Sequence, residues 1–232
     1  MFYRVLVPVA LMAAIPVSVH AQEPESSLIV VTASRAEEKL VDTLAPVTVV
    51  SREQIERLQS TDVQDLFLGL PGLTIASNGG PGKSTSLFIR GTESDHVLVL
   101  IDGIKVGSAT SGSTPFEQIP IDQIERIEIV RGPRSSLYGS EAIGGVIQIF
   151  TRRGNGKGAV ASFSAGRGTR GDSRLEAGLR GGIGRFWYGV GVSGRHTDGI
   201  NVRPSVAEPD KDAYDNRAGS ARLGYTFNEA AE

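Results

Sequence analysis

The part of the chain after Arg153 alternates apolar and polar side chains with the two-residue period of a β-strand. In one such segment Phe186, Tyr188 and Val190 share a face that is opposite to Gly189. Alternation of this kind predicts strands of a sheet with one apolar and one polar face. The segments that follow the pattern, about four in number, are residues 159–165, 175–180, 186–193 and 221–227.

These segments have roughly the length of a tilted strand that crosses an outer membrane. The turn at 181–184 is short and the loop at 196–216 is long, which is the asymmetry of periplasmic turns and external loops in membrane barrels. A β-meander with one solvated face is the alternative. Aromatic residues on the apolar faces and the absence of cysteine from a chain with an export signal favour the membrane sheet.

A sheet of this size cannot close on itself in a membrane, because about eight strands form the smallest closed barrel. Open sheet edges would leave backbone groups without hydrogen-bond partners in lipid. We therefore expect the sequence to be the N-terminal part of a longer barrel or a natural truncation of one.

The N-terminus has the layout of a signal peptide. Arg4 provides the positive region, an apolar stretch covers 5–17, and the small residue Ala21 suits a signal peptidase. We predict cleavage after Ala21. A buried N-terminal helix is less favoured, since Pro8 and Pro16 interrupt the apolar run.

The region between the signal and Arg153 has the pattern of a small α+β domain. Ser51 and Gln54 have capping-box spacing, which predicts a helix through Leu58 with Ile55 and Leu58 facing inward. A second helix begins at Asp62, presents Val63, Leu66 and Phe67 as its apolar face, and ends at Pro71-Gly72; a short third helix begins at Pro120. Strands are predicted at 47–50, 73–76, 87–90, 97–102, 127–130 and 146–151, with a turn at 138–140.

A separate β-branched segment lies near the start of the mature chain. It has no glycine or proline, and charged residues from Arg35 to Lys39 separate it from the next apolar run. A strand without a local partner is a candidate for pairing with the sheet edge of another protein. An ordinary edge strand of the following domain is the alternative. The segment consists of Leu28, Ile29, Val30, Val31, Thr32 and Ala33.

Two polar loops, 77–86 and 107–114, are rich in Gly, Ser and Thr. The first ends in Gly82-Lys83-Ser84, which is the end of a P-loop pattern, but Ser77 stands where that pattern needs its first glycine. A strand rather than a helix is predicted after it, so a nucleotide phosphate site is not expected.

Composition and spacing exclude other functions. The three histidines, His20, His96 and His196, are far apart and no nucleophile–base pair is evident, so we do not expect an enzyme. The net charge of −2 does not favour nucleic acid as a partner. A local basic cluster is expected to pair with acids such as Glu125, Glu128 and Glu141 or with acids of a barrel wall; it contains Arg131, Arg134, Arg152 and Arg153.

Several motifs, in this order after a signal peptide, resemble the TonB-dependent outer-membrane receptors. The segment 28–33 resembles the TonB box of this family. Ile89-Arg90-Gly91, the 100–103 sequence LIDG, and the stretch from Ile127-Glu128 to Ile147 resemble the signature of its plug domain. Within the family, residues 96–103 and 131–140 are most similar to the members that carry cobalamin (vitamin B12).

The resemblance implies an α+β plug domain, residues 41–154, inside a barrel of 22 antiparallel transmembrane strands, of which residues 158–232 would supply about four. Residues 22–40 would face the periplasm and present the TonB box to TonB and its inner-membrane energising complex. The ligand, a corrinoid or a siderophore, would enter from outside, and lipid would surround the barrel. The residues expected to contact the ligand are Asn78, Gly79, Gly80, Lys83, Ser84, Thr85, Lys105 and Ser108.

The resemblance also suggests a structural calcium ion in an external loop, while no other cofactor is required. Asp210, Asp212 and Asp215 alternate in the long loop, and carboxylates spaced in this way can converge on a hard cation. Active import of cobalamin is the expected function. A ferric-siderophore receptor and an isolated periplasmic plug module that binds ligand or TonB without transport remain alternatives.

Overall fold

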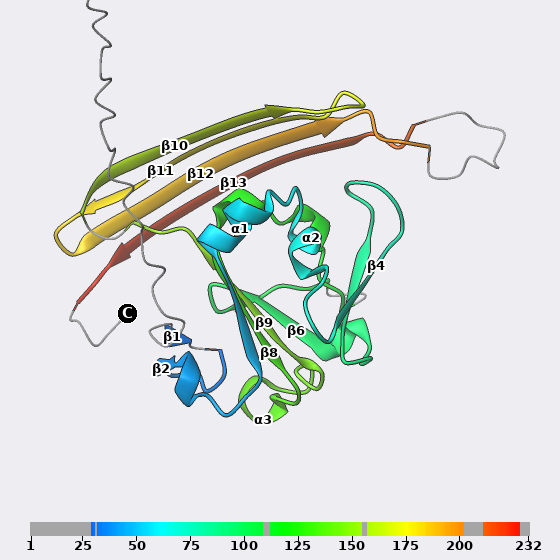
Figure 1. Cartoon of the computed structure of the whole chain (residues 1–232). Helices are drawn as coiled ribbons and strands as arrows, with labels where there is room; N and C mark the ends of the chain where they lie inside the picture. Colours follow the sequence, from blue (N-terminus) through cyan, green and yellow to red (C-terminus); the bar gives the residue numbers. More distant parts are fainter. Residues whose placement is uncertain (1–28, 31, 109–111, 155–156, 202–210, 228–232) are drawn as a thin grey trace, which may run out of the picture.

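The computed structural model describes residues 29–30, 32–108, 112–154, 157–201 and 211–227. The described residues form an N-terminal α+β domain that lies against a curved sheet of four long strands (Figure 1). We call this four-stranded sheet the wall. None of the helices in the described part of the chain has the length and apolar character needed to span a bilayer. The proposed signal peptide, residues 1–21, lies outside the described residues.

A five-stranded sheet forms the centre of the N-terminal domain. The contact between β6 and β9 is parallel and the other contacts are antiparallel. Apolar side chains cover both faces of the sheet: Ile127 and Ile147 belong to the larger core cluster, and Val146 belongs to a smaller one on the other face. The strands, in spatial order, are β3 (Val47–Ser51), β8 (Ile124–Arg131), β9 (Gly145–Thr151), β6 (Val97–Ile101) and β7 (Ile104–Lys105).

Helix α1 (Arg52–Leu58) confirms the predicted capping box. Gln54 N–H donates to Ser51 Oγ at 3.4 Å, and Ser51 N–H donates to Gln54 Oε1 at 3.1 Å. Ile55 is buried as expected, but Leu58 is 59% exposed, so its predicted inward orientation is wrong. Leu58 is the last residue of α1, and the left-handed backbone of Gln59 (φ 52°) ends the helix before a further turn can cover it.

The remaining helices are short. Helix α2 (Val63–Phe67) is capped at Asp62 and buries Val63, Leu66 and Phe67 as predicted, but it ends four residues before Pro71. The predicted helix after Pro120 is the 3₁₀ helix η5 (Ile121–Gln123). The predicted turn at 138–140 overlaps helix α3 (Ser135–Tyr138), whose last residue is Tyr138. The other 3₁₀ helices are η2 (Leu40–Asp42), η3 (Ser94–His96) and η4 (Phe116–Gln118).

Two hairpins flank the central sheet. Strands β4 (Leu73–Ser77) and β5 (Thr85–Ile89) form one. The other joins β1 (Ile29–Val30) to β2 (Glu38–Lys39), with Ile29 opposite Lys39 and Val30 opposite Glu38. The expectation that segment 28–33 has no local partner is therefore wrong. The charged residues that were taken to isolate it include its pairing partner, because an extended backbone can pair whatever its side chains are.

The wall consists of four antiparallel strands, and it confirms the alternation seen in the sequence. Side chains that point away from the N-terminal domain are mainly apolar, as in the cross-strand row Ala161, Leu179, Val190 and Ala221, which β10, β11, β12 and β13 each supply with one residue. The neighbouring row along the strands faces the N-terminal domain and consists of Ser162, Gly178, Gly191 and Ser220. The strands are β10 (Lys157–Arg167), β11 (Ser173–Ile183), β12 (Phe186–Thr197) and β13 (Tyr214–Tyr225).

The long loop between β12 and β13 is shorter than predicted, since β12 extends to Thr197 and β13 begins at Tyr214. Figure 1 shows the end of β12 and the start of β13 on the same side of the molecule as the β4–β5 loop, with β1, β2 and α3 at the other end of the N-terminal domain. The segment predicted to bind TonB and the predicted ligand loop 78–85 thus lie at different ends of the domain, whereas Lys105, also predicted to bind the ligand, lies in β7 and pairs with Glu141 next to α3.

Candidate functional site

The segment predicted to bind TonB is packed onto the N-terminal domain. The side chains of Val30, Thr32 and Ala33 are buried. Thr32 donates its backbone N–H to Glu128 Oε2 at 2.9 Å and its hydroxyl to the same oxygen at 2.7 Å. The Tyr138 hydroxyl donates to the Thr32 carbonyl at 3.1 Å. Leu28 and Val31 lie outside the described residues.

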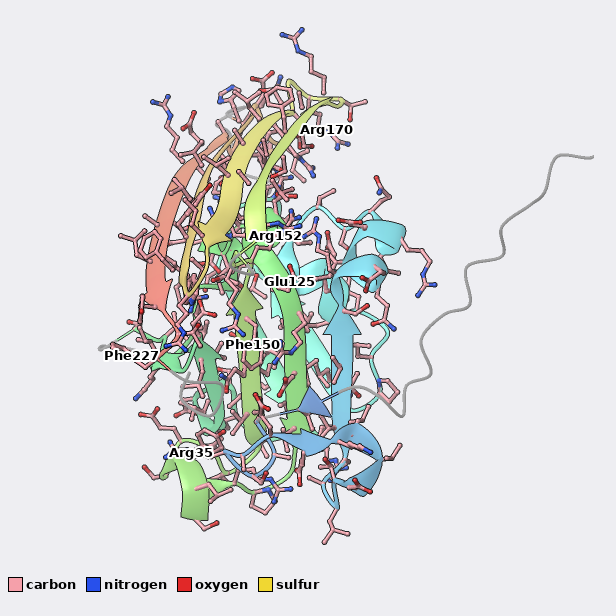
Figure 2. All side chains as sticks on the ribbon, turned by 90° about the vertical axis from the view of Figure 1, so that its left-hand side faces the viewer. Arg35, Glu125, Phe150, Arg152, Arg170 and Phe227 are labelled. Carbon is pink, nitrogen blue, oxygen red and sulfur yellow. The ribbon has the colours of Figure 1, made fainter. Side chains whose placement is uncertain are left out.

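The aromatic ring of Tyr138 also has a cationic neighbour. The guanidinium carbon of Arg35 lies 4.4 Å from the ring centroid, which is a cation–π distance. Burial raises the pKa of the Tyr138 hydroxyl above its ordinary range, so the hydroxyl stays protonated and remains a donor at neutral pH. Figure 2 shows Arg35 at the α3 end of the molecule and Arg170 at the far end of the wall.

The predicted ligand loop between β4 and β5 is held against the wall. Lys83 Nζ lies 2.7 Å from Asp212 Oδ1, in the loop before β13. Gly82 has a left-handed backbone (φ +77°), and a Cβ atom there would lie 2.0 Å from the Tyr214 ring. Only glycine fits at such a position, so the loop and the Tyr214 ring are matched in shape.

The predicted ligand residues fall into two groups. Asn78, Gly79, Ser84 and Ser108 are exposed, while Gly80 is partly covered. Thr85 is buried and donates to Gln64 Oε1. Lys83 is paired with Asp212, and the ammonium of Lys105 is paired with Glu141, which follows α3. The structure thus exposes Asn78, Gly79, Ser84 and Ser108 at the surface of the loops and engages both lysines within the protein.

Polar contacts tie the domain to the wall near the β12–β13 loop. Arg195 Nη1 lies 2.6 Å from Asp62 Oδ1, and Arg195 Nη2 lies 3.2 Å from Asp172 Oδ2 in the β10–β11 turn. The Tyr214 hydroxyl donates to the Glu117 carbonyl at 2.8 Å. Since the Asp62 carboxylate sits at the start of α2, the wall holds the helix at its N-terminus.

A second set of contacts lies near the start of the wall. Arg222 Nη1 lies 2.9 Å from Asp102 Oδ1 and donates to Thr151 Oγ1 at 2.8 Å. Glu125 Oε2 lies 3.5 Å from Arg180 Nη1 and 3.7 Å from Arg152 Nε. Figure 2 shows Glu125 and Arg152 where the domain meets the wall. Burial, followed by the charges of Arg180 and Arg52, lowers the pKa of Arg152.

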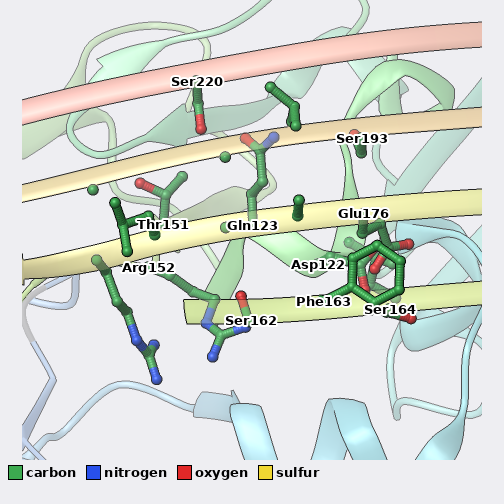
Figure 3. A pocket seen from close by; sticks show the side chains of 18 of the residues that line it. Asp122, Gln123, Thr151, Arg152, Ser162, Phe163, Ser164, Glu176, Ser193 and Ser220 are labelled. Atoms are coloured by element: carbon green, nitrogen blue, oxygen red, sulfur yellow. The ribbon is translucent and has the colours of Figure 1, made fainter. Parts of the chain in front are cut away.

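Between these two sets of contacts lies a cavity of about 560 Å³. Figure 3 shows it with Gln123 and Arg152 of the domain beneath the wall strands that carry Ser162 and Ser220. Its wall side is built from small residues such as Gly178 and Gly191. Hydroxyls and charged groups line the gap together with apolar side chains such as Ile55, and the domain contacts the wall through ion pairs on both sides of it.

The predicted basic cluster does not pair as a unit. Arg152 pairs with Glu125, but Glu141 pairs with Lys105, and Glu128 pairs with Arg126 at 2.9 Å. Arg131 donates to Thr48 Oγ1 at 2.7 Å, and burial, with Arg90 nearby, lowers its pKa. Its Nε and Nη2 atoms have no hydrogen-bond partner within the described ranges.

The predicted calcium ligands do not form a cluster in the described part of the chain. Asp212 pairs with Lys83, and Asp215 lies 3.4 Å from His196 Nδ1 and 3.4 Å from Arg217 Nε. No group of three or more metal-ligating side chains occurs among the described residues. Asp210 lies outside them, so calcium binding stays a prediction.

Comparison with known proteins assigns the N-terminal domain to a family. Residues 39–146 match the family described as TonB-dependent Receptor Plug Domain. Residues 39–146 are the plug domain of a TonB-dependent receptor. The prediction from the sequence motifs is confirmed, as is the fold: an α+β plug followed by antiparallel strands of an open, partial barrel.

The relatives of this plug and wall include proteins that are named as transporters. The chain is 40% identical over 205 residues to "Vitamin B12 transporter BtuB" of Photobacterium profundum, covering 88% of this chain and 34% of the relative. It is 43% identical over 220 residues to the protein of the same name from Vibrio cholerae, covering 93% of this chain and 36% of the relative. The chain therefore spans about a third of the length of the curated relatives it matches.

Solved structures share the fold. The siderophore receptor PirA from Acinetobacter baumannii has a TM-score of 0.64 and 25% identity, covering 87% of this chain and 31% of that one. FpvA from P. aeruginosa, solved with a bound pyoverdine, has a TM-score of 0.70 and 16% identity, covering 90% of this chain and 27% of that one. At this low identity, the second match supports the arrangement of plug and wall only.

Sequence reasoning missed the residues that hold Thr32 on the plug and those that connect the plug to the wall. Glu128 was expected only to balance nearby arginines, and Tyr138 was assigned to a turn. Arg195 and Tyr214 lie on wall strands and were not singled out. A partial signal was available, because an arginine on the inward face of a membrane strand needs an anionic partner.

Proposed function

We propose that the chain is part of an outer-membrane receptor that imports cobalamin with energy supplied through TonB. The observation that carries the proposal is the 43% identity across 93% of this chain to a protein named as a vitamin B12 transporter. Ligand would bind from outside over the exposed polar groups of the β4–β5 loop, including Asn78, Gly79 and Ser84. The family consists of receptors and transporters, and transport rather than catalysis is the activity proposed.

In this proposal the wall is one section of a closed barrel in the outer membrane. The outward row of Leu179 and Val190 faces lipid, and the N-terminal segment faces the periplasm. Strands β10 and β13 are the two edges of the described wall. Because an unpaired edge is too costly in lipid, transport requires further strands that complete the barrel.

TonB would bind the segment 28–33 by strand addition, in which backbone N–H and C=O groups supply the contacts. The alternating carboxylates Asp210, Asp212 and Asp215 belong to the same proposal as a calcium site that would order the external loop. Neither role requires a catalytic group.

The test is uptake of radiolabelled cyanocobalamin by cells that lack their own importer and express the full-length protein. Val30→Pro removes a backbone donor and the extended geometry that pairing needs, so energised uptake is expected to fall to background while ligand binding to outer membranes survives. Val30→Ile keeps the N–H and should retain uptake. Normal uptake by the proline variant would show that the TonB box has been misassigned.

A siderophore receptor is the second candidate, because the solved structures that share the fold include receptors for ferric enterobactin. Competition for binding separates the two candidates: Fe(III) chelates that displace a bound ligand while cobalamin does not would replace the cobalamin proposal. An isolated plug module that binds ligand or TonB without transport would remain in the periplasmic fraction, whereas the proposed receptor fractionates with the outer membrane.

A further inference from the structure

Thr32 lies within the proposed TonB box and is tied to a residue 96 positions away. Both its N–H and its hydroxyl donate to Glu128 Oε2, at 2.9 and 2.7 Å, and the hydroxyl also lies 3.4 Å from Gln148 Oε1. The side chain of Thr32 is fully buried. Contacts of this kind fix one residue of the segment in one position on the plug.

Glu128 is itself fully buried, near the middle of β8 and opposite Gln148 of β9 in the central sheet. Its other oxygen, Oε1, lies 2.9 Å from Arg126 Nε. A buried carboxylate is stable only while its hydrogen-bond partners are in place. If the segment left the plug, Glu128 would lose both bonds from Thr32, so the carboxylate favours the docked position.

The carbonyl of Thr32 is also engaged, because the Tyr138 hydroxyl donates to it at 3.1 Å. Strand addition uses the backbone N–H and C=O groups of the added strand. With both groups of Thr32 bonded to side chains of the plug, and Val30 buried beside them, the docked segment cannot offer these groups to a second protein. Docking and TonB binding are therefore alternatives.

We propose that Glu128 is a positioning residue that keeps the TonB box docked on the plug, and that the Tyr138 hydroxyl supplies a second such contact. Together the two residues set the affinity for TonB before the ligand binds. This inference rests on the proposed function, since it takes segment 28–33 to be the TonB box. It adds which groups of the plug hold the docked segment, the Glu128 carboxylate and the Tyr138 hydroxyl, so weakening these two contacts raises TonB affinity.

The experiment measures binding of the periplasmic domain of TonB to the full-length protein in detergent, without ligand. Glu128→Gln removes the charge that accepts both Thr32 bonds. Since hydrogen bonds to charged groups are the stronger class, the affinity for TonB is expected to rise about tenfold. Glu37→Gln, the same change at an exposed site between β1 and β2, is the matched control and should leave the affinity unchanged.

Tyr138→Phe provides a second, milder variant. It removes one hydroxyl donor and keeps the ring over which Arg35 lies, so the fold should be retained and the TonB affinity should rise a few-fold. Amide exchange at Thr32 should quicken in both variants, while exchange at the β8 and β9 amides stays slow. A merely structural role for Glu128 would change the sheet amides as well.

The outcomes separate this inference from the function on which it rests. If the Glu128 and Tyr138 variants bind TonB as the wild type does, while Val30→Pro abolishes binding, the positioning role is wrong and the TonB box stands. If no variant binds TonB, with or without cyanocobalamin, the TonB box itself is wrong. Should Glu128→Gln fail to fold, Tyr138→Phe alone decides, because an unchanged affinity there overturns the proposal.

Discussion

In the plug, Ile127, Ile129 and Ile147 lie inside and are fully buried, whereas in the wall Leu179 and Val190 point away from the protein and are about half exposed. The inward face of the wall carries glycine, serine and charged residues around a cavity of about 560 Å³. The plug therefore has the apolar interior of a water-surrounded domain, and the wall has the reverse arrangement. An inverted arrangement is stable when the surrounding solvent is lipid.

The difference also shows how the two regions are joined. Packing of apolar side chains holds the plug together, while ion pairs and single hydrogen bonds connect it to the wall, as at Arg195–Asp62 and Arg222–Asp102. The plug and the wall are thus joined by polar contacts rather than by a shared apolar core.

The largest stability effect is expected in the plug core. Ile129→Ala removes a fully buried side chain and should lower the free energy of unfolding of the plug by about 2–5 kcal/mol. Leu58→Ala, at a residue that is 59% exposed, should change it by less than about 0.5 kcal/mol. Urea unfolding of the full-length protein, followed by near-UV circular dichroism, measures both. Equal costs would mean that the core does not stabilise the plug.

A charge added to the wall should destabilise the folded protein much more on the outward face than on the inward face. Leu179→Lys places an ammonium on the outward row near the middle of β11 and should cost about 2–4 kcal/mol in a bilayer. Ser193→Lys places the same group over the polar cavity, beside Glu176 of the neighbouring strand, and should cost less than about 1 kcal/mol. Reversible folding into lipid vesicles measures the pair. The reverse order of costs would show that the faces of the wall have been assigned the wrong way round.

The ties between plug and wall should give a smaller effect. Arg195 is 13% exposed and pairs with Asp62 and Asp172, so Arg195→Met leaves two carboxylates without this partner. We expect this substitution to lower the free energy of unfolding by about 1–3 kcal/mol. Arg217→Met is the control, since the Arg217 side chain is 85% exposed on the outward side of β13. This substitution should leave the free energy of unfolding nearly unchanged. Amide exchange of α2 reports the release of the plug; slow exchange in both variants would contradict the tie.

The sequence predicted the regular elements because their signals are local. The capping box of Ser51 and Gln54 and the alternation through Phe186, Tyr188 and Val190 depend on residues that are close in the chain, and both are found. Local signals failed where an element is short: the segment after Pro120 became a 3₁₀ helix, and Leu58 ended outside the core.

The site was less predictable, because its contacts join residues that are distant in the chain. The bonds between Thr32 and Glu128 span 96 positions, and Lys83 meets Asp212 across 129. No spacing rule relates such residues. The family signature located the segment 28–33 and the loop 78–85, but only the fold shows that the first is docked and that the lysine of the second is paired.

The smallest effect is expected at the contact between the β4–β5 loop and the β12–β13 loop. Lys83 and Asp212 have side chains that are 38% and 32% exposed, so breaking their ion pair with Lys83→Gln should cost less than about 1 kcal/mol. If Asp210, Asp212 and Asp215 hold calcium as proposed, the Lys83 ammonium competes with the ion for Asp212. Removing the Lys83 ammonium should then raise the affinity of the protein for calcium by roughly two- to fivefold.

Calorimetric titration of the full-length protein with calcium chloride measures this change, with magnesium as a comparison ion, since a flexible loop of carboxylates accommodates calcium better than the smaller ion. Lys211→Gln, the same change one residue from Asp212, is the matched control. Equal affinities for the Lys83 and Lys211 variants would show that Lys83 does not compete. Absence of binding heat in all variants would remove calcium from the proposed function and leave the Lys83–Asp212 pair as the contact that joins plug and external loop.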